Sequence, residues 1–231
     1  MGAPKTRADL AKKAMAIDKV LVSLYGTPEV GHDNDPLDTL VETILSQNTT
    51  DANSHRAFLA LKARYPRWED LLGEAPRTVA GIIRSGGLAE MKAMRILDAL
   101  ALIMRERGEL DLDFLVRMSP SDADSWLSRM KGVGPKTRAI VLLFSLDMPS
   151  FPVDTHVHRV TKRIGLIGPR TSREQAQTEL ASLVPERKFY SFHINLIEHG
   201  RRVCHARGPE CPVCRISRYC ESWNARGNAQ T

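Results

Sequence analysis

Four cysteines, the only ones in the chain, lie within seventeen residues near the C-terminal end of the sequence. They are Cys204, Cys211, Cys214 and Cys220, with the spacing C-x6-C-x2-C-x5-C. Four thiolates this close in sequence can converge on one metal centre, and both zinc and iron–sulfur clusters accept four cysteine ligands. Zinc sites usually carry two short C-x2-4-C pairs, and this segment has one. The spacing alone leaves zinc and iron–sulfur open, while the lack of a secretory signal disfavours disulfides.

The second segment that could take part in binding or catalysis is a glycine-containing turn, Gly132-Val133-Gly134-Pro135-Lys136. Its glycines permit positive φ and leave backbone N–H groups uncovered before a helix, where such groups can bind a phosphate. The alternative is a plain link between two helices, with the glycines serving as C-caps. Four cations and no acid in residues 129–138 favour the phosphate site.

Asp154 opens a helical stretch after the segment Phe151-Pro152-Val153, which the proline keeps extended. Its residue type and place are those of an N-cap aspartate. His156 and His158 follow two residues apart, so on a helix they point in different directions and make a poor metal pair.

The net charge of +6 is unevenly distributed along the chain. Residues 129–138 and residues 200–231 each carry +4, so the other 189 residues together carry −2. Two solvated basic faces would explain this, but the overlap with the glycine turn and the cysteines favours surfaces that follow phosphates. No apolar run reaches the roughly 18 residues that span a bilayer, so we expect a cytoplasmic protein without a membrane partner.

Apolar residues recur with a helical period along nearly the whole chain, and no alternating strand pattern is present. The apolar stripe in residues 37–45 should belong to a helix that begins at Asp35-Pro36. Residues 139–144 are apolar on all sides, which predicts a central, buried helix. Thr171 and Glu174 should form a capping box.

Three motifs together resemble one family. The segment M-K-G-V-G-P-K-T, residues 130–137, resembles the helix–hairpin–helix of the endonuclease III family of DNA glycosylases. Val-Asp-Thr-His at 153–156 matches the family segment that holds the catalytic aspartate, and the cysteine spacing is that of the family's [4Fe–4S] cluster. The motifs occur in the family's order, and the resemblance covers roughly residues 20–223. It therefore implies that the four cysteines hold a [4Fe–4S] cofactor.

The resemblance implies an all-α, two-domain helix–hairpin–helix glycosylase fold. A helical barrel over residues 38–150 should carry the hairpin. Residues 1–37 and 151–231 should form a second helical domain with the cluster loop. DNA is expected to bind in the groove between them, where Lys136 and Asp154 meet.

The implied function is base excision repair of duplex DNA with oxidised pyrimidines or abasic sites. Lys136 matches the family's nucleophile, which displaces the base and forms a Schiff base before β-elimination nicks the strand. A lysine at the positive end of a helix dipole and partly desolvated favours the neutral amine that this attack requires. Asp154 would stabilise the positive charge on the sugar. The alternatives are a monofunctional or mismatch-type glycosylase, and a non-catalytic DNA-binding module that holds zinc.

A glycosylase must take its base out of the stack and fill the gap. The family uses two loops for this, which resemble residues 45–51 and the stretch around Gly87-Leu88. Leu88 is a candidate apolar wedge, though a buried position at the start of a helix is the alternative. We expect an intracellular, nucleoid-associated monomer. The expected DNA contacts are Gly132, Val133, Gly134, Gln47, Asn48, Leu88, His156, Arg201 and Arg207.

Overall fold

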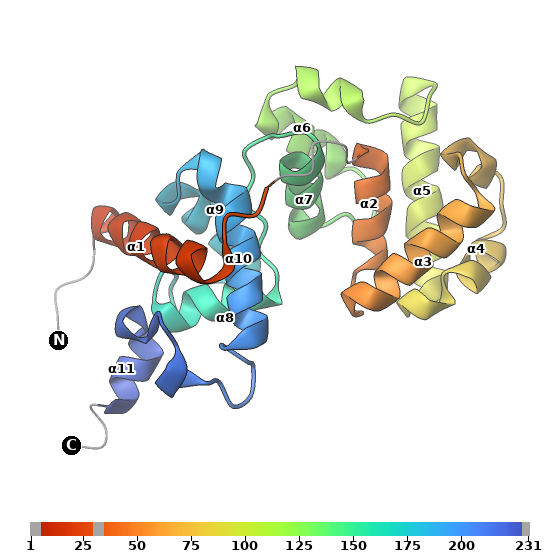
Figure 1. The fold of residues 1–231 in the computed structure, drawn as a ribbon. Coiled ribbons are helices and arrows are strands. Elements are labelled where there is room, and N and C mark those ends of the chain that lie inside the picture. Colours follow the sequence, from red (N-terminus) through yellow and green to blue (C-terminus); the bar gives the residue numbers. More distant parts are fainter. Residues whose placement is uncertain (1–5, 30–34, 228–231) are drawn as a thin grey trace. The chain divides into compact units, whose positions relative to one another are not determined.

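The computed structural model describes residues 6–29 and 35–227, and the regular structure in these ranges is entirely helical (Figure 1). The expected all-α class is therefore confirmed. The chain divides into two compact units, one formed by residues 31–148 and the other by residues 1–30 with 149–231. Among the helices that the structure describes, none is long and apolar enough to cross a membrane.

The unit of residues 31–148 contains six α-helices and three short 3-10 helices within its described part. Helix α2 packs against α3, α5 and α7, and α4 packs along α5 (Figure 1). The α-helices are α2 (Pro36–Leu45), α3 (Asp51–Arg64), α4 (Pro76–Ile82), α5 (Ala89–Arg107), α6 (Pro120–Leu127) and α7 (Pro135–Ser145). The 3-10 helices are η1 (Trp68–Leu71), η2 (Arg84–Gly86) and η3 (Asp113–Arg117).

Caps and apolar stripes explain why these helices form where they do. The Asp35 side chain accepts a hydrogen bond from the N–H of Asp38 and caps α2, with Pro36 in the first turn, as expected. The predicted stripe of α2 is buried in the core, as is most of residues 139–144 in α7. These stripes pack against each other within a core to which the other helices of the unit also contribute.

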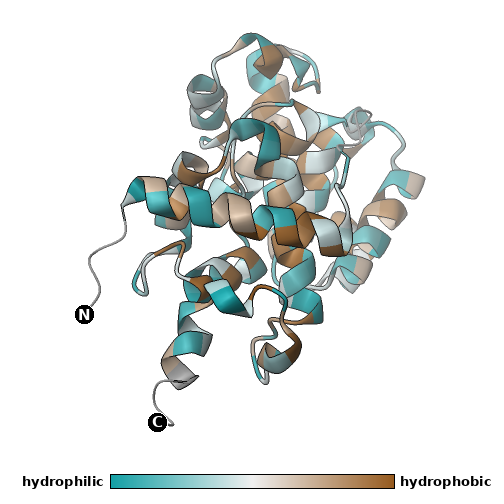
Figure 2. Cartoon of the chain, turned by 60° about the vertical axis from the view of Figure 1, so that its left-hand side comes forward, coloured by the Kyte–Doolittle hydropathy of each residue, from teal (hydrophilic) through white to brown (hydrophobic). Residues whose placement is uncertain are grey.

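The other unit is built from the two ends of the chain. Helix α1 packs against α9 and α10, and α8 packs against α10 and α11. Figure 2 shows apolar and polar residues alternating around α1, whose apolar side is buried. The α-helices are α1 (Arg7–Tyr25), α8 (Thr155–Ile164), α9 (Arg173–Leu183), α10 (Phe189–Arg202) and α11 (Glu221–Gly227). The 3-10 helices are η4 (Glu186–Lys188), η5 (Cys211–Val213) and η6 (Ser217–Tyr219).

One predicted cap lies a residue away from its expected place. The capping box of α9 is formed by Ser172 and Gln175, and the prediction of Thr171 and Glu174 is wrong. Both pairs fit the sequence pattern, Ser/Thr followed three residues later by Glu/Gln. The Thr171 backbone carbonyl instead accepts a hydrogen bond from Nε2 of His158, 2.8 Å away.

Candidate functional site

The glycine turn links α6 to α7 and has the backbone conformation of a hairpin. Gly132 has φ +84°, a left-handed conformation that favours glycine, whereas Gly134 has φ −80° and stands at the N-cap of α7. No side chain caps α7, so its first backbone N–H groups remain available to an anion. Val133 is buried, its N–H donates to the Met130 carbonyl at 3.1 Å, and its carbonyl accepts from Nη1 of Arg138 at 3.3 Å, so the structure leaves it no group free for DNA. Lys136 lies in the first turn of α7 and is half-buried.

A chain of polar contacts fixes this turn from α5. A Cβ on Gly132 would lie 2.4 Å from Nε of Arg95, so the arginine occupies the space that a side chain would take. Nη1 of Arg95 donates to Oε1 of Gln47 at 2.6 Å. Nε2 of Gln47 then donates to the Gly132 carbonyl at 3.1 Å. The structure thus brings two predicted site residues, Gln47 and Gly132, into contact.

The two expected base-extruding loops both carry a residue in an unusual backbone conformation. Asn48 has φ 54° and Leu88 has φ 50°, which are left-handed values that asparagine tolerates better than most residues and that leucine rarely adopts. Such strained positions cluster at functional sites. Leu88 is 52% exposed, so the alternative of a buried residue at a helix start is wrong.

Asp154 is the N-cap of α8, as expected. Its Oδ1 accepts a hydrogen bond of 2.7 Å from the N–H of Val157, and the carboxylate is half-buried. Nδ1 of His156 lies 3.1 Å from Nη2 of Arg159. The cap holds the carboxylate in one orientation through Oδ1.

All four cysteines line one pocket, which lies within the unit of residues 1–30 and 149–231. None of them forms a disulfide. No group of three or more His, Cys, Asp or Glu side chains in the described ranges is arranged to hold a metal ion. Burial raises the pKa of Cys214 and of Cys220, and the neighbouring cysteines contribute in the same direction. A positively charged metal centre would offset the cost of holding these thiolates together, so the residue types in this pocket, though not their present spacing, suit such a centre.

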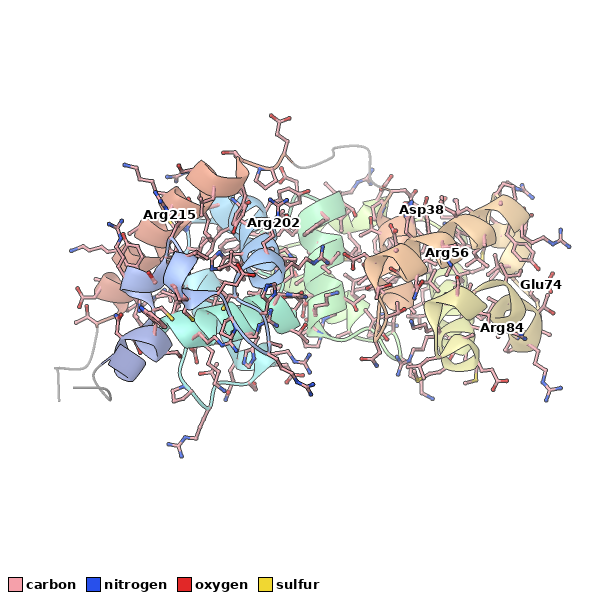
Figure 3. The ribbon with its side chains drawn as sticks, turned by 60° about the horizontal axis from the view of Figure 1, so that its bottom comes forward. Asp38, Arg56, Glu74, Arg84, Arg202 and Arg215 are labelled. Carbon is pink, nitrogen blue, oxygen red and sulfur yellow. The ribbon has the colours of Figure 1, made fainter. Side chains whose placement is uncertain are left out.

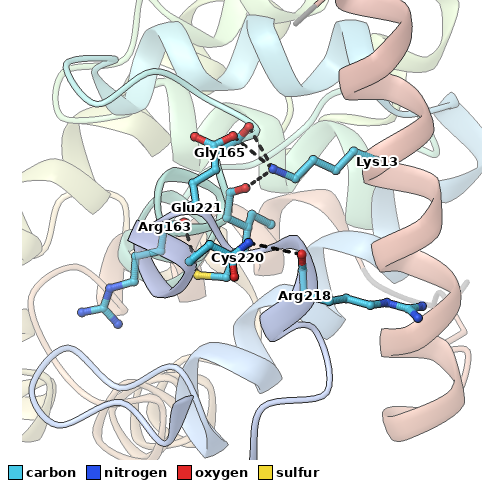
Figure 4. A network of polar contacts seen from close by, with 8 residues as sticks. Lys13, Arg163, Gly165, Arg218, Cys220 and Glu221 are labelled. Carbon is cyan, nitrogen blue, oxygen red and sulfur yellow. Dashed lines mark hydrogen bonds and ion pairs between the residues drawn. The ribbon is translucent and has the colours of Figure 1, made fainter. Parts of the chain in front are cut away.

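Two residues that sequence reasoning missed contact the cysteines directly. Nη1 of Arg163 lies 3.3 Å from Sγ of Cys204, and the Arg163 carbonyl oxygen lies 3.3 Å from Sγ of Cys220 (Figure 4). Nε2 of His199 lies 3.6 Å from Sγ of Cys214. Burial lowers the pKa of His199 to about 4, so its ring is neutral at neutral pH.

Arginines tie α8 to the cysteine segment. Arg159 donates through Nε to the carbonyl of Cys204 and through Nη2 to the carbonyl of Gly200, both at 2.9 Å. Arg163, one turn further along the same helix, donates to the carbonyl of His205 at 2.6 Å. The helix that Asp154 caps is therefore anchored to the loop that holds the cysteines.

The cysteine segment presents cations to solvent. Arg202 and Arg215 are labelled in Figure 3, and Arg202 also pairs with Glu198 and lies over the ring of Tyr25. Glu210, an acid in this segment, lies 3.3 Å from the ring of His205. The exposed arginines are Arg201, Arg202, Arg207, Arg215 and Arg218. Such a group suits contact with DNA phosphates.

The sequence matches the model of the HhH-GPD superfamily of base excision DNA repair proteins over residues 41–186. Endonuclease III of Thermotoga maritima is 31% identical over 203 residues, which are 88% of this chain and 91% of that protein. The chain belongs to the endonuclease III family. A DNA glycosylase homologue from Arabidopsis thaliana is 41% identical over 165 residues, but the chain spans only 56% of its length.

Solved structures of other proteins share the fold of this endonuclease III family protein. A trapped covalent intermediate of Endonuclease III with DNA aligns with a TM-score of 0.81 at 25% identity, over 94% of this chain and 98% of that one. A thermostable thymine-DNA glycosylase aligns with a TM-score of 0.76 at 24% identity, over 93% of this chain and 98% of that one. The expected helix–hairpin–helix glycosylase fold is confirmed.

The two hairpin glycines provide a matched pair of substitutions. We expect Gly132→Ala to lower the free energy of unfolding by about 1–2 kcal/mol from its left-handed backbone alone, with a further loss from the clash with Arg95. Gly134→Ala should cost less, about 0.5 kcal/mol, because its backbone is extended and nothing lies within 4 Å of the added Cβ, so that only the poorer N-cap preference of alanine remains. Urea unfolding of both variants measures this difference, and equal losses would contradict the described hairpin.

Proposed function

We propose that this protein is a bifunctional DNA glycosylase and abasic-site lyase that removes oxidised pyrimidines from duplex DNA. The observation that carries this proposal is Lys136, half-buried in the first turn of the helix that follows the hairpin. The fold shared with an Endonuclease III trapped covalently on DNA supports it. A monofunctional glycosylase would need no amine at this place.

In the proposed reaction the neutral amine of Lys136 attacks C1′ of the damaged nucleotide. The N-glycosidic bond breaks, and the base leaves with its electron pair and takes up a proton. The sugar ring then opens by cleavage of its C1′–O4′ bond, which gives a Schiff base between Lys136 and C1′. Loss of a proton from C2′ breaks the C3′–O bond and nicks the strand on the 3′ side. Water finally hydrolyses the Schiff base and releases Lys136.

Asp154 is proposed to stabilise the positive charge that develops on the sugar as the base departs. A carboxylate held in one place is suited to this, because it needs no reorganisation when the charge appears. Its hydrogen bond from the N–H of Val157 provides that rigidity. The carboxylate can also accept and return a proton during the elimination.

DNA binding is proposed to use the hairpin backbone and the basic C-terminal segment. The N–H groups at the start of α7 and the backbone of Gly132 and Gly134 suit a phosphate, whereas the N–H of Val133 already donates to the Met130 carbonyl at 3.1 Å. Arg201 and Arg207 are exposed and would contact further phosphates, and His156 would lie close to the strand. The protein would act as a monomer on nucleoid DNA inside the cell.

Cys204, Cys211, Cys214 and Cys220 are proposed to hold a [4Fe–4S] cluster, as their shared pocket and family spacing support. When bound, the cluster would link the four cysteines covalently and offset the negative charge of their thiolates. It would thereby stabilise a loop that has little regular structure of its own. Arg163 and His199 would then donate hydrogen bonds to the ligand sulfurs. The exposed arginines of the loop would be held in place for DNA.

Replacement of the nucleophile separates the two activities. We expect Lys136→Gln to abolish strand nicking of a duplex with one oxidised pyrimidine, because the amide cannot form a Schiff base. Lys131→Gln is the matched control, since it removes a cation from an exposed residue of the same hairpin. Nicking is measured by gel electrophoresis with and without alkali. Nicking by Lys136→Gln at the wild-type rate would contradict the mechanism, and base release without nicking by the wild type would favour the monofunctional alternative.

Two substitutions distinguish the capping of α8 from catalysis. Asparagine is as good an N-cap as aspartate, so Asp154→Asn should leave the free energy of unfolding nearly unchanged while excision slows by about a hundredfold or more. Asp154→Ala should lose about 1 kcal/mol of stability as well. Single-turnover excision rates and urea unfolding provide the two readouts. Wild-type excision by Asp154→Asn would show that the negative charge is not needed.

The metal content tests the cysteine site. We expect the purified protein to be brown, with visible thiolate-to-iron absorbance and about four irons and four sulfides per chain. Cys214→Ser should lose most of this colour, because serine replaces one thiolate ligand. A colourless protein that contains one zinc per chain would overturn the cluster and favour the zinc alternative.

A further inference from the structure

Lys92 is a fully buried lysine that lies on α5, and it makes two short contacts. Its relative exposure is 0%, and its Nζ donates to the Leu45 carbonyl at 2.6 Å and to the Gly86 carbonyl at 2.7 Å. Leu45 is the last residue of α2, and Gly86 is the last residue of η2. The two carbonyls therefore belong to segments that are far apart in sequence and are joined by one ammonium group.

Burying an ammonium group lowers the stability of the fold, because the charge loses its hydration. A lysine at a fully buried position therefore indicates a specific role for its hydrogen bonds. Burial lowers the pKa of Lys92, and the charge of Arg95 lowers it further. An apolar side chain at this place would fit the core stripe of α5, whose neighbouring positions are occupied by Ala93 and Ile96. This chain therefore carries a lysine at a position where packing alone favours an apolar residue.

The two joined segments lead directly into the two strained loop tips. Asn48 follows Leu45 by three residues, and Leu88 follows Gly86 by two. Both tips are exposed and have positive φ. Exposed tips in a rare conformation need an anchor close by, because strain of this kind persists only where the surroundings hold it.

Arg95, almost one turn beyond Lys92, extends the anchor to the hairpin. It donates to Gln47 at 2.6 Å and occupies the space over Gly132, whose carbonyl accepts from Gln47 at 3.1 Å. Both polar ends of the Gln47 amide are thereby engaged within the protein. Gln47 links α5 to the hairpin through these two hydrogen bonds, so its amide is not available to DNA. Asn48 and Leu88 are therefore the side chains that the two loops expose for contact with DNA.

We propose that Lys92 and Arg95 are positioning residues that hold the two base-extruding loops and the hairpin in one fixed arrangement. This inference rests on the proposed function, because it concerns extrusion of the damaged base. Extrusion costs stacking and pairing energy, which the loop tips must offset by filling the gap in the duplex. Tips that are held in place before DNA binds lose less conformational entropy when they enter.

The test compares chemistry on a nucleotide whose base must be unstacked and unpaired with chemistry on an abasic site, which has no base to remove from the stack. We expect Lys92→Met to slow excision of a paired oxidised pyrimidine by about tenfold or more relative to nicking of a preformed abasic site. Arg95→Met should shift the same ratio in the same direction, and Arg95→Lys should restore part of it. Arg105→Met is the control, since it removes an exposed cation from the same helix and should leave the ratio unchanged.

A second readout does not depend on catalysis. Duplexes with 2-aminopurine beside the lesion report unstacking by fluorescence, and thermal unfolding shows that each variant is folded. We expect wild-type protein to raise the fluorescence and Lys92→Met to raise it less at saturating protein concentration. Equal losses in excision and abasic nicking, with wild-type fluorescence, would overturn the inference. If Lys92→Met does not fold, Arg95→Met decides by the same two readouts. If the wild-type protein raises the fluorescence but excises no base, the proposed function is refuted. The positioning role of Lys92 and Arg95 is then still supported if their variants raise the fluorescence less.

Discussion

The left-handed backbone of Gly132 and the Arg95 side chain packed against it form the contact on which the hairpin of the 31–148 unit depends. In the proposed role the N–H groups at the start of α7 stay uncovered, so the turn must be supported through its other atoms. Arg138 of α7 donates to the Val133 carbonyl at 3.3 Å, and further support comes from α5, through Arg95 and then Gln47. The same helix reaches both loop tips through Lys92. One helix thus sets the positions of three irregular segments.

In the other unit, an irregular segment is likewise held in place by side chains of a neighbouring helix, in this case by arginines. The segment between α10 and α11 has little regular structure apart from two short 3-10 helices, and its four cysteines face one pocket. Arg159 and Arg163 of α8 hold this segment by hydrogen bonds to its backbone. The same helix begins at Asp154. The proposed cluster site and the Asp154 carboxylate are therefore connected through one helix, α8.

Sequence patterns predicted the helices well, because periodicity and caps are local. The Asp35 and Asp154 caps are present as expected, while the α9 cap moved by one residue because two overlapping pairs fit the same pattern. The roles of Lys136 and the cysteines remain predictions that rest on family motifs. The anchor formed by Lys92 was missed because it joins carbonyls 6 and 47 residues away, and contacts of that range leave no periodic signal. A lysine within the core stripe of α5 was the available clue.

Borohydride trapping followed by peptide mapping tests the central claim most directly. The protein is incubated with a duplex that contains one oxidised pyrimidine, the Schiff base is reduced, and the crosslinked peptide is identified by mass spectrometry. The account predicts a covalent adduct on Lys136 that the Lys136→Gln variant does not form. An adduct on another residue, or base release with no adduct at all, would contradict it.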